Sequence, residues 1–284
     1  MRGVRQHFLG ACLVVLAASH MSADGQESVP SDLLERMGRY VEDYYARTRT
    51  IVGRETVRLQ PLDSSLRPEG NSRSLEYELR IEWDGTTPTP TAPSMNRQLT
   101  RKSGRLENAF DSPDCFDPHA SSIDPLAILL AANRDSFTFT MKGLRDGGRV
   151  AMIDYTPVER GTPEVVWKGE CASIELNGQT QGRIWADVAS GAVLRMEERL
   201  SKPFQFAIPK NFLGGRQPIS QTLDRLETGI RYEPVTFRDP DETLLLPKSI
   251  RTLAVFYNGG VPRLLTLQSY DRYRRFMTGG RIVK

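Results

Sequence analysis

The residues best suited to chemistry lie close together in the segment DSPDCFDPH, residues 111–119. Its three aspartates supply the oxygen ligands that a hard cation prefers, and His119 supplies the imidazole that a Ser-His-Asp site requires. Aspartate, serine and proline are also the usual residues of turns, and a loop anchored at Cys115 accounts for all of them. We therefore expect a structural loop here, with a cation site and a catalytic site as the alternatives.

Two further segments contain clusters of charged residues, one acidic and one basic. The acidic residues Asp239, Asp241 and Glu242 lie within residues 237–247, and paired carboxylates do acid–base work when they are held at the right separation. Because they surround a proline between two expected strands, we interpret them as solvated turn residues. The segment YDRYRRF, residues 270–276, has the composition of some nucleic-acid surfaces. We expect instead an edge strand that arginine keeps soluble.

Other reactive side chains are scarce in this chain. It contains three histidines, and two of them, His7 and His20, lie in the segment that we interpret below as a leader. We find no H-E-x-x-H, G-x-S-x-G, P-loop or G-x-G-x-x-G motif. With one histidine left, the chain has few of the ligands that zinc or copper sites need and little basis for a Cys-His catalytic pair. The sequence therefore predicts a protein that is not an enzyme and that carries no metal and no cofactor.

The first residues have the pattern of a secretory signal peptide. A basic start, Met1–His7, precedes the apolar run Phe8–Ser19, which is shorter than the roughly 20 residues that span a bilayer. We assign residues 1–23 to the signal, with cleavage between positions 19 and 25, and expect a periplasmic or extracellular protein without a stable transmembrane segment after processing. The alternatives are a buried N-terminal helix and a lipoprotein attached through Cys12. In this chain most of the apolar run follows that cysteine, whereas a lipoprotein signal has it before the cysteine.

Cleavage would leave two cysteines and an almost balanced charge. In an oxidising compartment the pair Cys115 and Cys171 favours a disulfide, and two buried free thiols are the alternative. The formal charge of +3 falls to about +1 when the two arginines of the signal are lost. This balance gives no overall attraction to nucleic acid or to an anionic membrane, so we expect no nucleic-acid partner.

The remaining sequence predicts a mainly β fold with a few helices. Residues 31–47 place apolar side chains at helical spacing and predict an amphipathic helix packed under a sheet, with a ligand-facing lid as the alternative. Residues 124–132 predict a short buried helix that begins at an Asp-Pro pair. Most other segments alternate apolar and polar residues, as in about ten antiparallel strands. We predict a curved antiparallel sheet, or half-open β-barrel, wrapped around the N-terminal helix and the short internal helix.

Such a sheet would present a concave apolar face to a ligand. We assign the candidate ligand-binding side chains from the two-residue alternation of the strands. They are Tyr77, Leu79, Trp83, Phe139, Trp185 and Leu194.

Two hairpin-like stretches resemble a known family. The first, GRIWADVASGAVLRMEERL at residues 182–200, has an aromatic strand, a Ser-Gly turn and a Leu-Arg-x-Glu strand. The second is VTFRDPDETLLLPKSI at residues 235–250. Together with the order of elements over residues 31–277, they resemble the periplasmic lipoprotein-carrier (LolA-like) superfamily and its uncharacterised secreted bacterial relatives. The resemblance implies one half-barrel domain over these residues whose concave face holds acyl chains or another apolar ligand. This chain is longer than the small carriers and has its own cysteine pair.

We therefore expect a secreted or periplasmic, non-enzymatic binding or carrier protein for an apolar or lipid-like ligand, with an envelope protein as a further partner. The first alternative is a structural or protein-interaction module of the cell envelope whose interior is filled by its own side chains. The second is a secreted hydrolase or cation-dependent enzyme built around His119.

Overall fold

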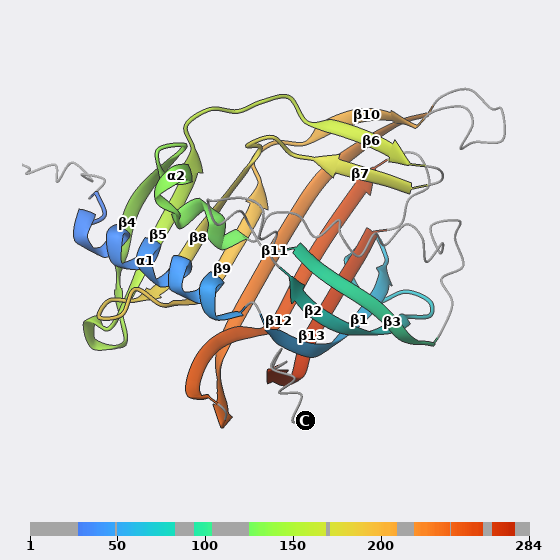
Figure 1. Ribbon diagram of the computed structural model, residues 1–284. Coiled ribbons are helices and arrows are strands. Elements are labelled where there is room, and N and C mark those ends of the chain that lie inside the picture. The colour runs from blue at the N-terminus through green and yellow to red at the C-terminus, as the bar shows by residue number, and fades with distance from the viewer. Residues whose placement is uncertain are drawn as a thin grey trace, which may run out of the picture.

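The computed structural model is dominated by one large antiparallel sheet (Figure 1). The structure describes residues 28–48, 50–82, 94–103, 125–168, 171–208, 219–238, 240–257 and 263–275. Within these ranges no helix is long and apolar enough to cross a membrane.

The main sheet has eleven strands in the described part of the chain and is not closed into a barrel. In the order in which they pair, its strands are β3 (Ser94–Ser103), β2 (Arg73–Glu82), β1 (Ile51–Leu62), β13 (Arg263–Arg275), β12 (Asp241–Tyr257), β11 (Ile219–Arg238), β9 (Val193–Leu200), β8 (Thr180–Asp187), β5 (Val150–Pro157) and β4 (Phe137–Arg145), while β10 (Phe204–Ile208) also pairs with β11. A separate hairpin is formed by β6 (Glu164–Lys168) and β7 (Cys171–Glu175). The predicted mainly β architecture is confirmed.

The N-terminal helix α1 (Ser31–Thr48) lies along one face of this sheet, in front of β5, β8 and β9 in Figure 1. Its apolar residues recur every three or four positions and therefore share one buried stripe. The predicted helix over residues 31–47 is confirmed. We call the face of the main sheet that carries α1 the helix side and the opposite face the polar face.

The predicted internal helix is a 3₁₀ turn followed by one short α-helix. They are η3 (Pro125–Leu129) and α2 (Ala131–Arg134). The side chain of Asn133 donates a hydrogen bond to the carbonyl of Ala127 at 2.9 Å and ties the two pieces together. Leu126 and Leu129 are buried against α1, as the apolar run predicts.

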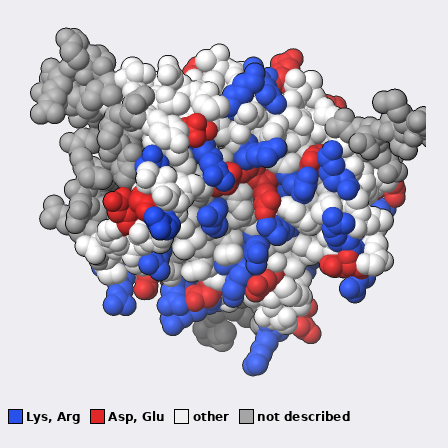
Figure 2. Space-filling model, turned by 180° about the vertical axis from the view of Figure 1, so that it is seen from behind, with Lys and Arg blue, Asp and Glu red and all other residues white. Residues whose placement is uncertain are grey.

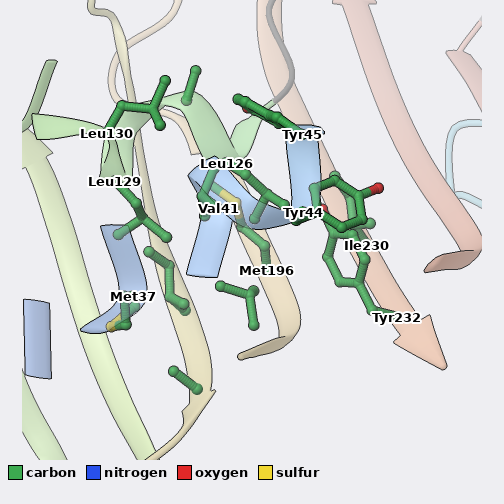
Figure 3. Close-up of a cluster of buried hydrophobic side chains, with 14 of the residues drawn as sticks. Met37, Val41, Tyr44, Tyr45, Leu126, Leu129, Leu130, Met196, Ile230 and Tyr232 are labelled. Carbon is green, nitrogen blue, oxygen red and sulfur yellow. The ribbon is translucent and has the colours of Figure 1, made fainter. Parts of the chain in front are cut away.

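A packed hydrophobic core fills the space between α1, η3 and the sheet strands β5, β8, β9, β11 and β12 (Figure 3). Met37 and Val41 of α1 are fully buried there, and Met196 and Ile230 meet them from the sheet. Two glycines let backbones approach where any side chain would collide. A Cβ at Gly38 would lie 2.9 Å from the carbonyl oxygen of Leu129, and one at Gly191 would lie 2.7 Å from the backbone of α1. The helix is thus held by direct backbone contact as well as by apolar packing.

The β8–β9 hairpin contains the predicted Ser-Gly turn. The carboxylate of Asp187 accepts hydrogen bonds from the backbone N–H and the hydroxyl of Ser190, at 2.8 and 2.7 Å. These bonds lower the pKa of Asp187, the hydroxyl having the largest effect. Gly191 follows with a positive φ of 74°, which glycine adopts without strain.

Two sequence-based expectations are wrong. The Arg-rich strand β13 is not an edge strand, because it pairs with β1 on one side and β12 on the other. Two of its arginines are neutralised by acids of other strands: Arg274 pairs with Glu78 of β2 at 2.8 Å, and Arg275 pairs with Glu242 of β12. Glu242 is not a solvated turn residue. Its side chain is 14% exposed and forms ion pairs with Arg47 of α1 and Arg275 of β13.

Candidate functional site

The helix side of the sheet carries a second apolar cluster beyond α1. We call it the outer apolar cluster: Val57 and Leu59 of β1, Leu75 and Tyr77 of β2, and Leu264 of β13 packed against them. It is separate from the core under α1. The helix side therefore has two apolar regions.

Between these two regions lies a row of half-exposed threonines, which we call the threonine strip. Thr228 of β11, Thr252 of β12 and Thr266 of β13 are directly opposite one another in the register of the sheet. The hydroxyls of Thr228 and Thr252 are 3.3 Å apart and share a hydrogen bond. Each threonine presents a methyl group as well as a hydroxyl, so the strip suits contact with an amphipathic molecule.

A buried polar network lies next to the outer apolar cluster. The carboxylate of Glu55 is fully buried and accepts hydrogen bonds from Arg97 at 2.6 and 3.2 Å, from Gln268 at 2.8 Å and from the hydroxyl of Tyr270 at 2.9 Å. Burial, followed by the charge of Glu55, raises the pKa of Tyr270 well above its usual range. A carboxylate with four donors is satisfied in spite of its burial, which makes this network a structural anchor of the β1–β2–β3–β13 end.

The structure separates the predicted ligand-binding residues. Tyr77 and Leu79 are buried on β2, at the end of the helix side away from α1. Phe139 packs against the core under α1 at the other end. Trp185 points to the polar face, where the guanidinium of Arg195 stacks 4.6 Å from its ring centre. Leu194 is half-buried at the register shift between β8 and β9.

The other predicted site residues lie wholly or partly outside the described residues. These are Trp83, the segment 111–119 with its histidine and aspartates, Asp239, and the side chains of Cys115 and Cys171. The disulfide therefore stays a prediction. Within the described ranges, no three His, Cys, Asp or Glu side chains are placed to hold a metal ion.

A polar groove of about 1020 Å³ runs across the opposite face of the sheet. Figure 2 shows this face, with basic and acidic side chains intermixed over it. Eight strands contribute to the groove: β1, β2, β5, β8, β9, β11, β12 and β13. Its arginines are Arg58, Arg183, Arg195, Arg199, Arg231 and Arg251. We call it the polar-face groove.

One row of paired residues shows how the sheet builds the groove. In register order it reads Asp154, Arg183, Glu197, Gly229, Arg251, Leu267, Arg58 and Ser74. Each is offset by one position from a core-facing neighbour, so its side chain projects to the polar face. Gly229 leaves the middle of the row without a side chain, and nothing but the Glu197 side chain lies within 4 Å of where a Cβ would be.

A half-buried acid, Glu198, lies at one end of the groove. The hydroxyl of Tyr155 donates to the carboxylate of Glu198 at 2.9 Å. Burial raises the pKa of Glu198 above its usual range, and burial together with Glu198 raises that of Tyr155. Glu198 therefore takes up a proton more readily than an ordinary surface glutamate.

Sequence reasoning missed the polar-face groove. A signal was present in the arginines that alternate with core residues, as in LRMEERL of β9 and LETGIRY of β11. The register that aligns these arginines across the strands depends on strand order, which the alternation does not specify.

The chain is thus a mainly β protein with an open antiparallel sheet and an amphipathic helix on one face. No protein-family model and no curated protein matches it. Solved structures that resemble it include a DUF1329 family protein from Desulfovibrio piger, with 12% identity, a TM-score of 0.39 and coverage of 86% of this chain and 90% of that chain.

Two further structures come from other bacteria. A LolA superfamily protein from Nitrosomonas europaea has 8% identity, a TM-score of 0.36 and coverage of 88% of this chain and 97% of that chain. A putative outer membrane lipoprotein-sorting protein domain from Vibrio parahaemolyticus has 12% identity, a TM-score of 0.37 and coverage of 87% and 95%. Because all three TM-scores are below 0.5, function must be inferred from the residues of this chain.

Proposed function

We propose that this chain is an exported, non-enzymatic binding protein that carries an apolar, lipid-like ligand along the threonine strip. The observation that supports this most directly is that the strip is half-exposed while apolar residues flank it on both sides. An acyl chain lying along it would contact Ile230 and Ile250 at one edge and Leu264 at the other. Each 100 Å² of apolar surface removed from water would contribute about 2.5 kcal/mol.

The proposed ligand is amphipathic rather than a pure hydrocarbon. The threonine hydroxyls offer hydrogen bonds in the middle of the strip, and the Glu198 carboxyl lies opposite Thr228 in the same row. A molecule with a long apolar chain and a polar end satisfies both the apolar flanks and these polar groups. The expected export signal supports a ligand that the protein meets in the periplasm or outside the cell.

Photo-crosslinking tests the proposal. A palmitate analogue with a diazirine in its chain is added to the protein, irradiated, and the labelled peptides are identified by mass spectrometry. We expect labelling of β11, β12 and β13 around the threonine strip and of the outer apolar cluster, reduced by excess unlabelled palmitate. Labelling that is confined to the polar face, for example at the exposed Leu267, would contradict the proposal.

A pair of variants on one strand sharpens the test. Thr252→Phe fills the strip, whereas Thr243→Phe places the same ring at an exposed position nearer the start of β12. We expect Thr252→Phe to abolish specific labelling and Thr243→Phe to retain it. Equal labelling of the two variants would show that the strip does not hold the acyl chain.

A second function is favoured by the packing of α1. The backbone contacts at Gly38 and Gly191 and the filled core in Figure 3 suit an envelope module that is held rigid and has no internal ligand. Hydrogen exchange of α1 and of β11–β13 with and without palmitate separates the two functions. Slower exchange of β12 on adding palmitate supports the carrier, and exchange that palmitate leaves unchanged throughout supports the rigid module.

A further inference from the structure

The polar-face groove contains more arginines than its acidic side chains neutralise. Arg183 is paired with Asp154 at 2.5 Å, and Arg195 is paired with Glu197. The remaining carboxylates are engaged elsewhere. Glu227 pairs with Arg225 at 2.6 Å, and the carboxyl of Glu198 bonds to Tyr155 on the helix side. Four arginines of the groove have no acidic partner in the described part of the chain: Arg58, Arg199, Arg231 and Arg251.

The register of the sheet brings two of these positive charges, those of Arg231 and Arg251, near each other and near Arg195, which is paired with Glu197. Arg231 of β11 lies directly opposite Arg195 of β9. Arg231 pairs with Ser249 of β12, and Arg251 follows Ser249 by two residues, so Arg231 and Arg251 project from the same face of the sheet. Like charges in such positions repel one another, and a bound anion between them removes the repulsion. The missing side chain at Gly229, which lies opposite both Glu197 and Arg251, leaves space for it.

Small hydroxyl residues make up the rest of this part of the groove. Thr56, Ser74, Ser249 and Ser269 line it together with the arginines. Ser249 and Ser269 are opposite one another in register, between Arg231 on one side and Thr56 on the other. Hydroxyls donate single hydrogen bonds to an oxyanion, while a planar guanidinium donates two in parallel. The combination matches the three or four oxygens of a phosphate group.

We propose that the polar-face groove binds a phosphate group, with Arg231 and Arg251 as its main ligands and Ser249 and Ser269 as hydroxyl donors. This site is on the opposite face from the threonine strip, so it does not depend on the carrier function. The phosphate belongs either to a small soluble phosphate compound or to the headgroup of an anionic phospholipid. The phosphate group would make the same contacts in both cases, but only the phospholipid also has acyl chains.

Titration with inorganic phosphate and with glycerol 3-phosphate tests the site. Trp185 lies in the same row as Arg195 and Arg231, so in a Trp83→Phe/Trp167→Phe background its fluorescence reports changes in the groove, and calorimetry gives the affinity. We compare the full chain with the double variant Arg231→Ser/Arg251→Ser. We expect the double variant to bind on the order of tenfold or more weakly, because two charge-assisted hydrogen-bond donors are lost.

The control removes the same charge elsewhere. Arg145 and Arg160 are exposed, lie outside the groove and have no ion pair in the described part of the chain. We expect Arg145→Ser/Arg160→Ser to retain the affinity of the unaltered protein. An equal loss in the two double variants would show a general effect of net charge and would overturn the proposal. Circular dichroism of each variant confirms that it is folded before its affinity is compared.

Vesicles identify the source of the phosphate. We use phosphatidylcholine vesicles with and without phosphatidylglycerol in a flotation assay. Binding of the soluble phosphates that depends on Arg231 and Arg251 assigns the site to a small ligand. Binding of phosphatidylglycerol vesicles alone, with the same dependence, assigns it to a lipid headgroup. Failure of both kinds of probe to bind would refute the site, while the crosslinking result on the helix side would be unaffected.

Discussion

The buried pair of Glu55 and Arg97 allows a double-mutant cycle with a defined expectation. The Glu55 side chain is 0% exposed and that of Arg97 is 9% exposed. Glu55→Gln leaves a buried guanidinium without its counter-charge, and Arg97→Met leaves a buried carboxylate that only Gln268 and Tyr270 still contact. Removing one partner of a buried pair costs about 3–5 kcal/mol. This is a large share of the roughly 5–15 kcal/mol by which a domain is stable.

The double variant Glu55→Gln/Arg97→Met should recover most of that loss. It buries no charge at either position, and the amide oxygen of the introduced glutamine still accepts a hydrogen bond from Tyr270. We expect a cost of about 1–2 kcal/mol, far below the sum of the single changes. Urea unfolding followed by circular dichroism measures all four free energies of unfolding.

A matched surface pair controls for burial. Arg183 and Asp154 also form a bidentate ion pair, with hydrogen bonds of 2.5 and 3.0 Å, but their side chains are 40% and 30% exposed. Their coupling energy should be about 0.2–1 kcal/mol. Additive effects of the Glu55 and Arg97 changes, or an equally large coupling energy for the surface pair, would show that burial does not strengthen the Glu55–Arg97 interaction.

Three further predictions concern α1 and its surroundings. Gly191→Ala should lower the free energy of unfolding by about 2–4 kcal/mol, because the residue has a positive φ and the added methyl group would collide with the α1 backbone. The control Gly147→Ala, at a positive φ of 68° but with open space around it, should lower it by only about 1 kcal/mol. Thermal unfolding measures both variants. Because burial raises the pKa of Glu198, the folded state binds its proton more tightly than the unfolded state; stability should fall as the pH rises from about 4.5 towards the folded-state pKa. In Glu198→Gln that part of the slope should disappear, and an unchanged pH profile would contradict it. Glu242→Gln should cost about 1–3 kcal/mol and speed hydrogen exchange in the last turn of α1, because Arg275 loses its charged partner and Arg47 keeps only Asp43; unaltered exchange there would rule out an anchoring role.

The local elements of this fold could be predicted because their signals are local. The stripe of Leu33, Met37, Val41 and Tyr44 repeats every three or four residues, so it specifies α1 without any knowledge of the sheet. The Ser-Gly turn after Asp187 specifies the β8–β9 hairpin in the same way. The two-residue period also identified the apolar face of β2, where Tyr77 and Leu79 are buried, but not that of β8, where Trp185 points to the polar face.

The partners of each strand could not be predicted in this way. Nothing in YDRYRRF specifies whether β13 is an edge strand or a central one. The answer depends on β1, which lies more than two hundred residues earlier in the chain. The burial of Glu242 likewise depends on two arginines, one in α1 and one in β13, that no local pattern connects. Sites assembled from many strands, such as the polar-face groove, are therefore the features that sequence reasoning is least able to find.

The pairing of β1 with β13 also has a consequence for how the chain reaches its native state. The first and last strands of the sheet are neighbours, so the centre of the sheet cannot form until nearly the whole polypeptide is available. The apolar stripe of α1 has nothing to cover it until β8 and β9, which end at Leu200, are available, and before then it is a target for chaperones or for aggregation. Contacts so distant in sequence also slow the search for the native topology. This connectivity suits a chain that crosses a membrane unfolded and matures only after its release, as the proposed export requires.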